Sequence, residues 1–165
     1  MTTRLILYGC TIAGAYYVVS FIQAYFHRAL AHRAFGRCFY EIHVGSHHTI
    51  YSGSHQVADR YSAEERSITF TFVVPYAVVQ ASALLALPVD MFAVELVSCS
   101  VVALAHAYIH VHYHLTQTWL DRFAWFRRLR AYHSIHHENT NANFAVIEPF
   151  WDRVFGTYQA PHHDT

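Results

Sequence analysis

Three histidines, His133, His136 and His137, lie close together near the end of the chain. Residues three and four positions apart are neighbours on a helix surface, so a helix here would present the three imidazoles on one side. Neutral imidazole nitrogen is a good ligand for iron, zinc and copper. The segment therefore predicts a metal site.

Two further histidine clusters lie in the first third of the chain. His27 and His32 are five residues apart, a rotation of about 140° on an ideal α-helix, so both could serve one metal only if the helix bends or ends between them. In the second cluster, four-residue spacing aligns His43 with His47 and leaves His48 pointing about 100° away. Such a doublet could bridge two ions.

The remaining cluster falls at the end of an apolar segment. His106, His110 and His114 form a stripe with four-residue spacing, and His112 points away from it. Ionisable side chains at that depth in a membrane are costly unless they face a polar cavity or a metal. Spacing alone leaves open whether His106 with His110, or His110 with His114, supplies a ligand pair.

Taken together, the clusters contain at least ten candidate ligands, and ten imidazoles imply two ions because one ion takes four to six. The near absence of cysteine and carboxylate from the clusters disfavours iron–sulfur, calcium and magnesium sites. We expect redox iron attacking a C–H bond of a lipid, with zinc as the competitor because it accepts the same donor. The predicted metal ligands are His27, His32, His43, His47, His48, His106, His110, His114, His133, His136 and His137.

The elements that must position these histidines are long and apolar. Residues 5–26 carry no charged side chain, and at ~1.5 Å per residue they reach about 33 Å, enough to cross a hydrocarbon core of about 30 Å. Two further apolar runs, 68–87 and 91–109, are separated so closely that they must be antiparallel. The sequence predicts an all-α integral membrane protein with about three transmembrane helices; a soluble bundle is the alternative.

Composition and charge agree with this architecture. The chain has 165 residues, of which 54% are hydrophobic, which fits a single membrane-bound domain spanning 1–165. Three spans would place ten of the eleven arginines on one side of the membrane, the positive-inside pattern. The histidine-rich segments 27–67 and 110–165 are therefore expected to form a helical cap on the cytoplasmic side. Residues 119–130 could lie along the headgroups as an amphipathic helix, or form a solvated connector.

Some functions are disfavoured by the same composition. The formal net charge is zero and no basic run is interleaved with aromatic residues, so no nucleic-acid partner is expected. The three cysteines are far apart and odd in number, which makes disulfides and thiolate zinc sites improbable. His55, His162 and His163 stand apart from the clusters and are expected at the surface.

The four histidine clusters, followed by Asn143, Phe144 and the ending from Trp151 to Thr157, resemble the fatty acid hydroxylase superfamily over residues 26–158. This group of membrane di-iron enzymes includes sterol desaturases, fatty acid hydroxylases and carotene hydroxylases. The resemblance implies two iron ions, O2 as oxidant, and an electron donor such as a b-type cytochrome, ferredoxin or reductase. It also favours the pair of His110 and His114.

The expected activity is hydroxylation of a C–H bond in a lipid or lipid-like substrate, with metal-held O2 and external electrons. Desaturation by the same metal pair is the alternative within enzymes, since no residue separates the two outcomes. Outside enzymes, the chain could be a histidine-rich membrane protein that binds or transports zinc, or that holds haem. Histidines gathered on one side of the bilayer disfavour transport, and haem needs only one or two axial ligands.

Overall fold

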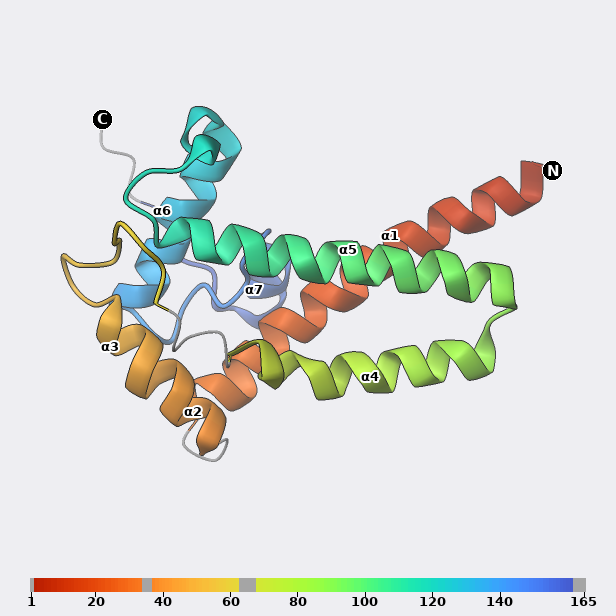
Figure 1. Cartoon of the computed structure of the whole chain (residues 1–165), viewed down its shortest axis with the longest axis horizontal. Coiled ribbons are helices and arrows are strands. Elements are labelled where there is room, and N and C mark those ends of the chain that lie inside the picture. Colours follow the sequence, from red (N-terminus) through yellow and green to blue (C-terminus); the bar gives the residue numbers. More distant parts are fainter. Residues whose placement is uncertain (1, 34–36, 63–67, 162–165) are drawn as a thin grey trace.

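The computed structural model describes residues 2–33, 37–62 and 68–161, and the elements within these ranges are helical. Apart from an isolated bridge between Ala58 and Leu115, the described residues form no β-structure. The all-α prediction is thus confirmed for this part of the chain (Figure 1). The helices are α1 (Thr2–Phe26), η1 (His27–Ala31), α2 (Cys38–Ile42), η3 (His43–His47), α3 (His48–Ile50), α4 (Ile68–Ala86), α5 (Val89–Tyr113), η5 (Trp119–Arg122), α6 (Ala124–Glu138) and α7 (Phe150–Phe155).

Three long helices form an arm that extends away from the shorter ones (Figure 1). Helix α1 packs against α5 and α4, and α4 packs against α5. The two later helices are joined only by Leu87 and Pro88, so they are antiparallel, as the sequence predicted. Small side chains allow the close approach of α1 and α5, where Ala15 and Val19 pack against Cys99.

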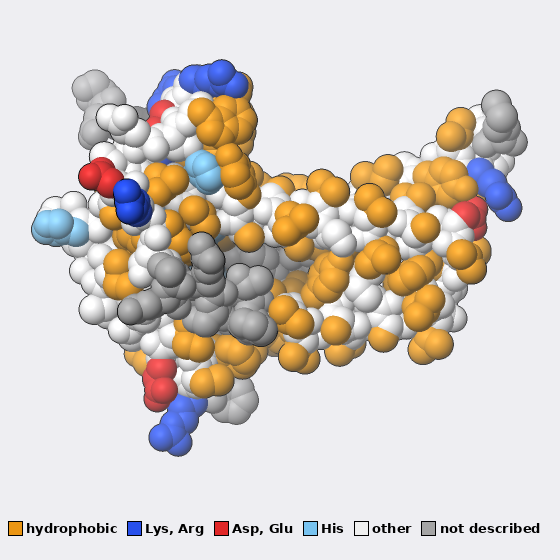
Figure 2. Space-filling model, in the orientation of Figure 1, with side chains coloured by type: hydrophobic (Ala, Val, Ile, Leu, Met, Phe, Trp, Pro, Cys, Tyr) orange, Lys and Arg blue, Asp and Glu red, His pale blue; other side chains and the backbone are white. Residues whose placement is uncertain are grey.

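The surface of the arm is apolar (Figure 2). Leu85 and Leu104 are 88% and 70% exposed, and soluble monomers rarely expose large continuous apolar patches. Within the described part of the chain, two helices, Thr2–Ala31 and Val89–Tyr113, are long and apolar enough to cross a membrane. The apolar helical stretch Phe72–Ala86 is shorter, so a third span at 68–87 remains a prediction.

The far end of the arm is closed by polar contacts between α1 and the start of α5. The Arg4 guanidinium lies 3.5 Å from the Asp90 carboxylate, and the Tyr8 hydroxyl donates a hydrogen bond of 2.8 Å to the same carboxylate. Charged side chains on the visible face of Figure 2 lie at the two ends of the molecule, with the hydrophobic belt between them.

The other end of the arm carries a cap built from the remaining helices (Figure 1). A small core of Tyr113, Leu120, Phe126 and Val146 joins the end of α5 to α6. The Arg130 guanidinium donates to the His112 and Leu115 carbonyls at 2.8 and 3.0 Å. His112 lies in the last turn of α5 and Leu115 just beyond it, so Arg130 fixes the C-terminus of α5 against α6.

Helix α7 begins after Pro149 and ends before Gly156, two residue types that favour the start and the end of a helix. Gly156 has φ 68°, the left-handed conformation that terminates many helices. The helix packs on α1, where the Trp151 indole donates to the Ser20 hydroxyl at 3.0 Å and contacts the Phe21 ring edge-on. This contact brings the C-terminal segment back to the histidines of the first cluster.

Candidate metal centre

The first histidine cluster lies on a π-helical turn, η1. A backbone hydrogen bond of 3.2 Å joins the His32 amide to the His27 carbonyl, which are five residues apart. The wider turn of a π-helix stacks residues at this spacing, and such turns are frequent at functional sites. His27 and His32 therefore face the same centre, with ring centroids 5.0 Å apart. The helix also ends at Ala31, between the two histidines, which is one of the two conditions expected from the sequence.

A second π-helical turn, η3, determines how the next cluster is divided between ligand groups. The His48 amide bonds to the His43 carbonyl, again five residues away. His43 consequently joins His48 in one group of potential ligands, and His47 joins another. The rings of His43 and His47 nevertheless stack, with centroids 5.0 Å apart, in line with the predicted alignment, although the two residues belong to different groups. The prediction that the His47 and His48 doublet can serve two centres agrees with this arrangement.

Nine histidines converge into two groups, and within each group the potential ligand nitrogens lie within 4.8 Å of one another. Group A draws its residues from η1 and the position after it, from η3, from α3 and from α6. Group B draws its residues from η3, the end of α5 and α6. Most of these side chains are buried. Group A contains His27, His32, His43, His48 and His136, and group B contains His47, His114, His133 and His137.

The two groups are adjacent. The ring of His48 in group A stacks on that of His137 in group B, with centroids 4.3 Å apart. The rings of His133 and His136, one from each group, are also stacked, at 5.6 Å. The arrangement is therefore one compartment with two potential ion positions, at the junction of arm and cap.

Backbone carbonyls orient four of the imidazoles. In group A, His27 Nδ1 lies 2.6 Å from the Phe144 oxygen and His136 Nδ1 lies 2.7 Å from the Ala142 oxygen. In group B, Nδ1 of His114 and of His137 lie 2.9 and 2.8 Å from the oxygens of residues 56 and 51. A carbonyl only accepts hydrogen bonds, so each Nδ1 carries the proton. Each Nε2 then keeps a lone pair for a metal.

The Nε2 atoms face one another at distances that fit a bound ion. His133 Nε2 lies 3.1 Å from the Nε2 atoms of both His114 and His137. A single proton on His133 could bridge to only one of these lone pairs. By contrast, ligands at ~2.0–2.1 Å from one ion are about 3 Å apart. The donor set therefore fits a metal better than a network of hydrogen bonds.

The surroundings also keep the imidazoles neutral. Burial lowers the pKa of His114 to about 4 and that of His137 to about 3. Burial, followed by repulsion from neighbouring imidazoles, holds the pKa values of His43, His133 and His136 well below the usual value. A neutral imidazole is the form that binds metal.

Asp152 is a buried residue whose role the sequence analysis missed. Its carboxylate accepts hydrogen bonds from the Phe144 and Ala145 amides at 2.9 and 2.7 Å, and from the Tyr132 and Thr157 hydroxyls at 2.5 and 2.6 Å. Burial and the Asp152 carboxylate raise the pKa of Tyr132, which therefore keeps its proton and donates. Asp152 thus fixes the segment whose carbonyl oxygen orients His27.

Gln23 performs a related task from α1. Its side-chain oxygen accepts from the Val146 amide at 3.1 Å, and its side-chain nitrogen donates to the Phe144 carbonyl at 3.1 Å. In the sequence, the signal that could have identified Gln23 is its amide side chain within the apolar segment 5–26. Together with Asp152, Gln23 holds the backbone segment 144–146 against the His27 ring.

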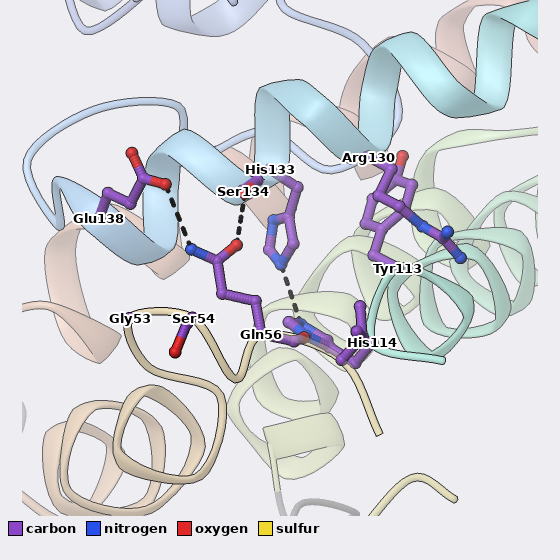
Figure 3. A pocket seen from close by; sticks show the side chains of 10 residues that line it. Gly53, Ser54, Gln56, Tyr113, His114, Arg130, His133, Ser134 and Glu138 are labelled. Carbon is purple, nitrogen blue, oxygen red and sulfur yellow. Dashed lines mark hydrogen bonds between the residues drawn. The ribbon is translucent and has the colours of Figure 1, made fainter. Parts of the chain in front are cut away.

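A pocket of about 260 Å³ adjoins group B (Figure 3). Gln56 bridges its walls, accepting from the Ser134 hydroxyl and donating to Glu138 at 3.5 Å. The backbone of the same residue orients His114. The lining residues, which include two histidines of group B, are Gly53, Ser54, Gln56, Val57, Tyr113, His114, Arg130, His133, Ser134 and Glu138.

Other histidines lie at or outside the edge of these groups. The His110 ring is 4.9 Å from the rings of both His47 and His133, so it borders group B. His106 is buried one helical turn further into the arm and belongs to neither group. His112 bonds to the Tyr108 carbonyl and points away, as expected. His55 is exposed, and residues 162 and 163 lie outside the described part of the chain.

Comparison with known proteins adds one match. A family model described as fatty acid hydroxylase matches residues 12–157. This range contains both groups and most of the apolar arm. No curated protein and no solved structure matches the chain.

Proposed function

Because the chain belongs to the fatty acid hydroxylase family, we propose that it is a membrane-bound di-iron oxygenase. In this proposal it hydroxylates a C–H bond of a lipid or lipid-like substrate, using O2 and electrons from a separate donor protein. The observation that supports it most is the pair of adjacent histidine groups at one end of an apolar helical arm.

We assign one iron to each group. Group A offers five imidazoles, and His110 would complete group B as a fifth ligand because its ring borders His47, His114 and His133. His106 has no place in either set of five, so its assignment as a ligand stays a prediction. Iron and zinc accept the same imidazole donors, so zinc could replace iron in purified protein.

The two iron ions, when bound, would supply the redox chemistry that activates O2 against an unreactive C–H bond. The chain contributes the environment. Its carbonyl groups hold the imidazoles in a single tautomer, and burial keeps them neutral and the compartment dry. Excluding water protects reactive species from side reactions.

The membrane supplies the substrate in this proposal. We propose that α4 crosses the bilayer with α1 and α5, and that the cap faces the cytoplasm with ten of the eleven arginines. A lipid would then reach the groups from the apolar arm, and the electron donor would approach the cap from water. Fatty acyl chains, sterols and carotenoids all fit such an approach.

The proposal is tested by lipid analysis under isotopically labelled O2. Lipids from cells that express the chain should contain a product with one labelled oxygen, and cells that express His136→Ala should lack it. His112→Ala is the matched control, because His112 points away from both groups. A product that lacks two hydrogens and carries no label would indicate desaturation. No new product, or one that persists in His136→Ala, would contradict the proposal.

A further inference from the structure

A segment between α5 and α6 lies beside the arm. The Trp119 indole donates a hydrogen bond of 2.8 Å to the Tyr108 hydroxyl, which projects from the side of α5. Residues 118–128, which we call the collar, comprise η5 and the start of α6. Figure 1 shows this part of the chain projecting sideways from α5, away from the other cap helices.

The position of the collar corresponds to a membrane surface. Asp90, paired with Arg4, marks the polar end of the arm at the far side. Tyr108 lies eighteen residues further along α5, which corresponds to ~27 Å of helix, close to the hydrocarbon thickness of about 30 Å. Trp119 is therefore at headgroup level if α5 crosses the bilayer.

The aromatic side chains of the collar continue the apolar surface of the arm. Trp119 and Trp125 are 53% and 47% exposed, and Leu104 and Tyr108 on the neighbouring part of α5 are 70% and 46% exposed. Tryptophan at this level is typical of membrane–water interfaces, because the ring has both an apolar body and a polar N–H group.

Three exposed arginines of the collar, Arg122, Arg127 and Arg128, have no carboxylate partner among the described residues. Its acidic residue, Asp121, is already engaged by the Arg130 guanidinium at 2.8 Å and by the Thr118 amide at 3.0 Å. The Arg122 guanidinium stacks on the Trp119 ring at 4.9 Å, which leaves its positive charge unneutralised. Figure 2 shows arginine side chains gathered at the outer tip of this projection, with hydrophobic side chains between them and the arm.

We propose that the collar binds the phosphate groups of anionic lipids in the leaflet that faces the cap. The inference rests on the membrane placement in the proposed function. Guanidinium groups match phosphate oxygens in geometry and charge, and each basic side chain near an anionic surface gives roughly a fivefold preference. A bound headgroup layer would hold the end of α5, and therefore His110 and His114, at a fixed depth.

A lipid surface fits the collar better than a protein partner. The exposed tryptophans adjoin the lipid-facing side of α5, and the arginines lie at the outer edge of the same segment. An electron-donor protein would need to approach the buried histidines of the cap, whereas the collar projects sideways from the cap end of α5 (Figure 1).

The inference is tested by tryptophan fluorescence in vesicles. In a Trp151→Phe background, the tryptophans that remain are Trp119 and Trp125. The protein is reconstituted in mixed phosphatidylcholine and phosphatidylglycerol, with bromine quenchers on the acyl chains of one lipid or the other at equal mole fraction. Brominated phosphatidylglycerol should quench severalfold more than brominated phosphatidylcholine. The excess should vanish in Arg122→Gln/Arg127→Gln/Arg128→Gln and persist when the same three arginines are changed to lysine.

Equal quenching by the two lipids, or an excess that persists in the glutamine variant, would overturn the inference. The inference would also be overturned if the glutamine variant differs from the unaltered protein only in slower electron uptake from a donor protein. That result would identify the collar as a protein-docking surface. Vesicle flotation and carbonate extraction separate the two proposals. Protein that floats with the vesicles but shows no quenching retains the membrane placement and disproves the collar site, whereas protein that does not float disproves both.

Discussion

At the residue scale, the candidate centre depends on which ring nitrogen of each histidine carries the proton. Carbonyl groups fix this choice for four imidazoles, and two of those carbonyls belong to Ala142 and Phe144. The sequence predicted the histidines from their type and spacing. It could not predict the carbonyl partners, because a backbone oxygen is present at every residue and only the fold decides which one meets a ring.

Asp152→Asn should disrupt group A more than group B. The substitution removes the charge that accepts four hydrogen bonds and turns one acceptor atom into a donor that faces buried N–H groups. Unsatisfied buried groups cost about 1–3 kcal/mol each, so the melting temperature in detergent should fall by several degrees. Bound metal should also decrease. Asp59→Asn, at an exposed position, should leave both unchanged; an unaltered Asp152→Asn protein would show that this carboxylate does not support the site.

Gln23→Leu tests the support of His27 from α1. Leucine fills a similar volume but leaves the Val146 amide without its acceptor and removes one of the two donors to the Phe144 carbonyl. We expect metal loss of up to one ion per chain, from group A, with the helical content preserved. Gln80→Leu, which lies in α4 away from the histidines, serves as the control. Full metal content in Gln23→Leu would argue that the carbonyl network is dispensable.

At the element scale, two π-helical turns decide which histidines meet. Spacings of five residues pair His27 with His32 and His43 with His48. Hydrophobic and histidine periodicity predicted the long helices and the antiparallel α4 and α5, because those features follow local rules of helix geometry. The five-residue spacing of His27 and His32 already indicated that the helix between them is not an ideal α-helix. Between His43 and His48 the competing four-residue spacing to His47 hid the same feature, so the partition between groups A and B required the structure.

Metal removal should loosen the cap and leave the arm intact. Both groups draw ligands from α6 and from the segment of η3 and α3, so bound ions would tie these elements together. Chelation should therefore increase amide hydrogen exchange in residues 43–50 and 130–138 by at least tenfold, since bound metal stabilises the structure that binds it. Exchange in the middle of α5 should change little. Equal protection with and without metal would contradict this coupling.

At the scale of the whole molecule, the apolar arm and the polar cap meet at the histidines. Figure 2 shows the hydrophobic belt and the charged ends that this division produces. The family match over residues 12–157 covers both parts. Composition predicted the division because exposed apolar side chains need lipid. The side of the membrane on which the cap lies follows only from the arginine pattern and remains a prediction.

The metal-free protein should lose stability in mild acid. In the unfolded chain, histidine titrates near ~6.5, whereas burial lowers the pKa of His114 to about 4 and that of His137 to about 3 in the folded state. The unfolded state therefore binds more protons as pH falls below about 6.5, and the free energy of unfolding decreases until the folded-state pKa values are reached. Above about 6.5 this contribution is constant. Thermal unfolding of chelated protein in detergent measures it, and a melting temperature independent of pH across the window would be contrary to expectation.

Metal analysis of purified chain, combined with single substitutions, tests the central claim most directly. The account predicts about two iron or zinc ions per chain in the unaltered protein and in His112→Ala. His136→Ala in group A and His133→Ala in group B should each retain about one. Fewer than one ion per unaltered chain, or two ions retained in both of these variants, would contradict a two-metal centre built from groups A and B.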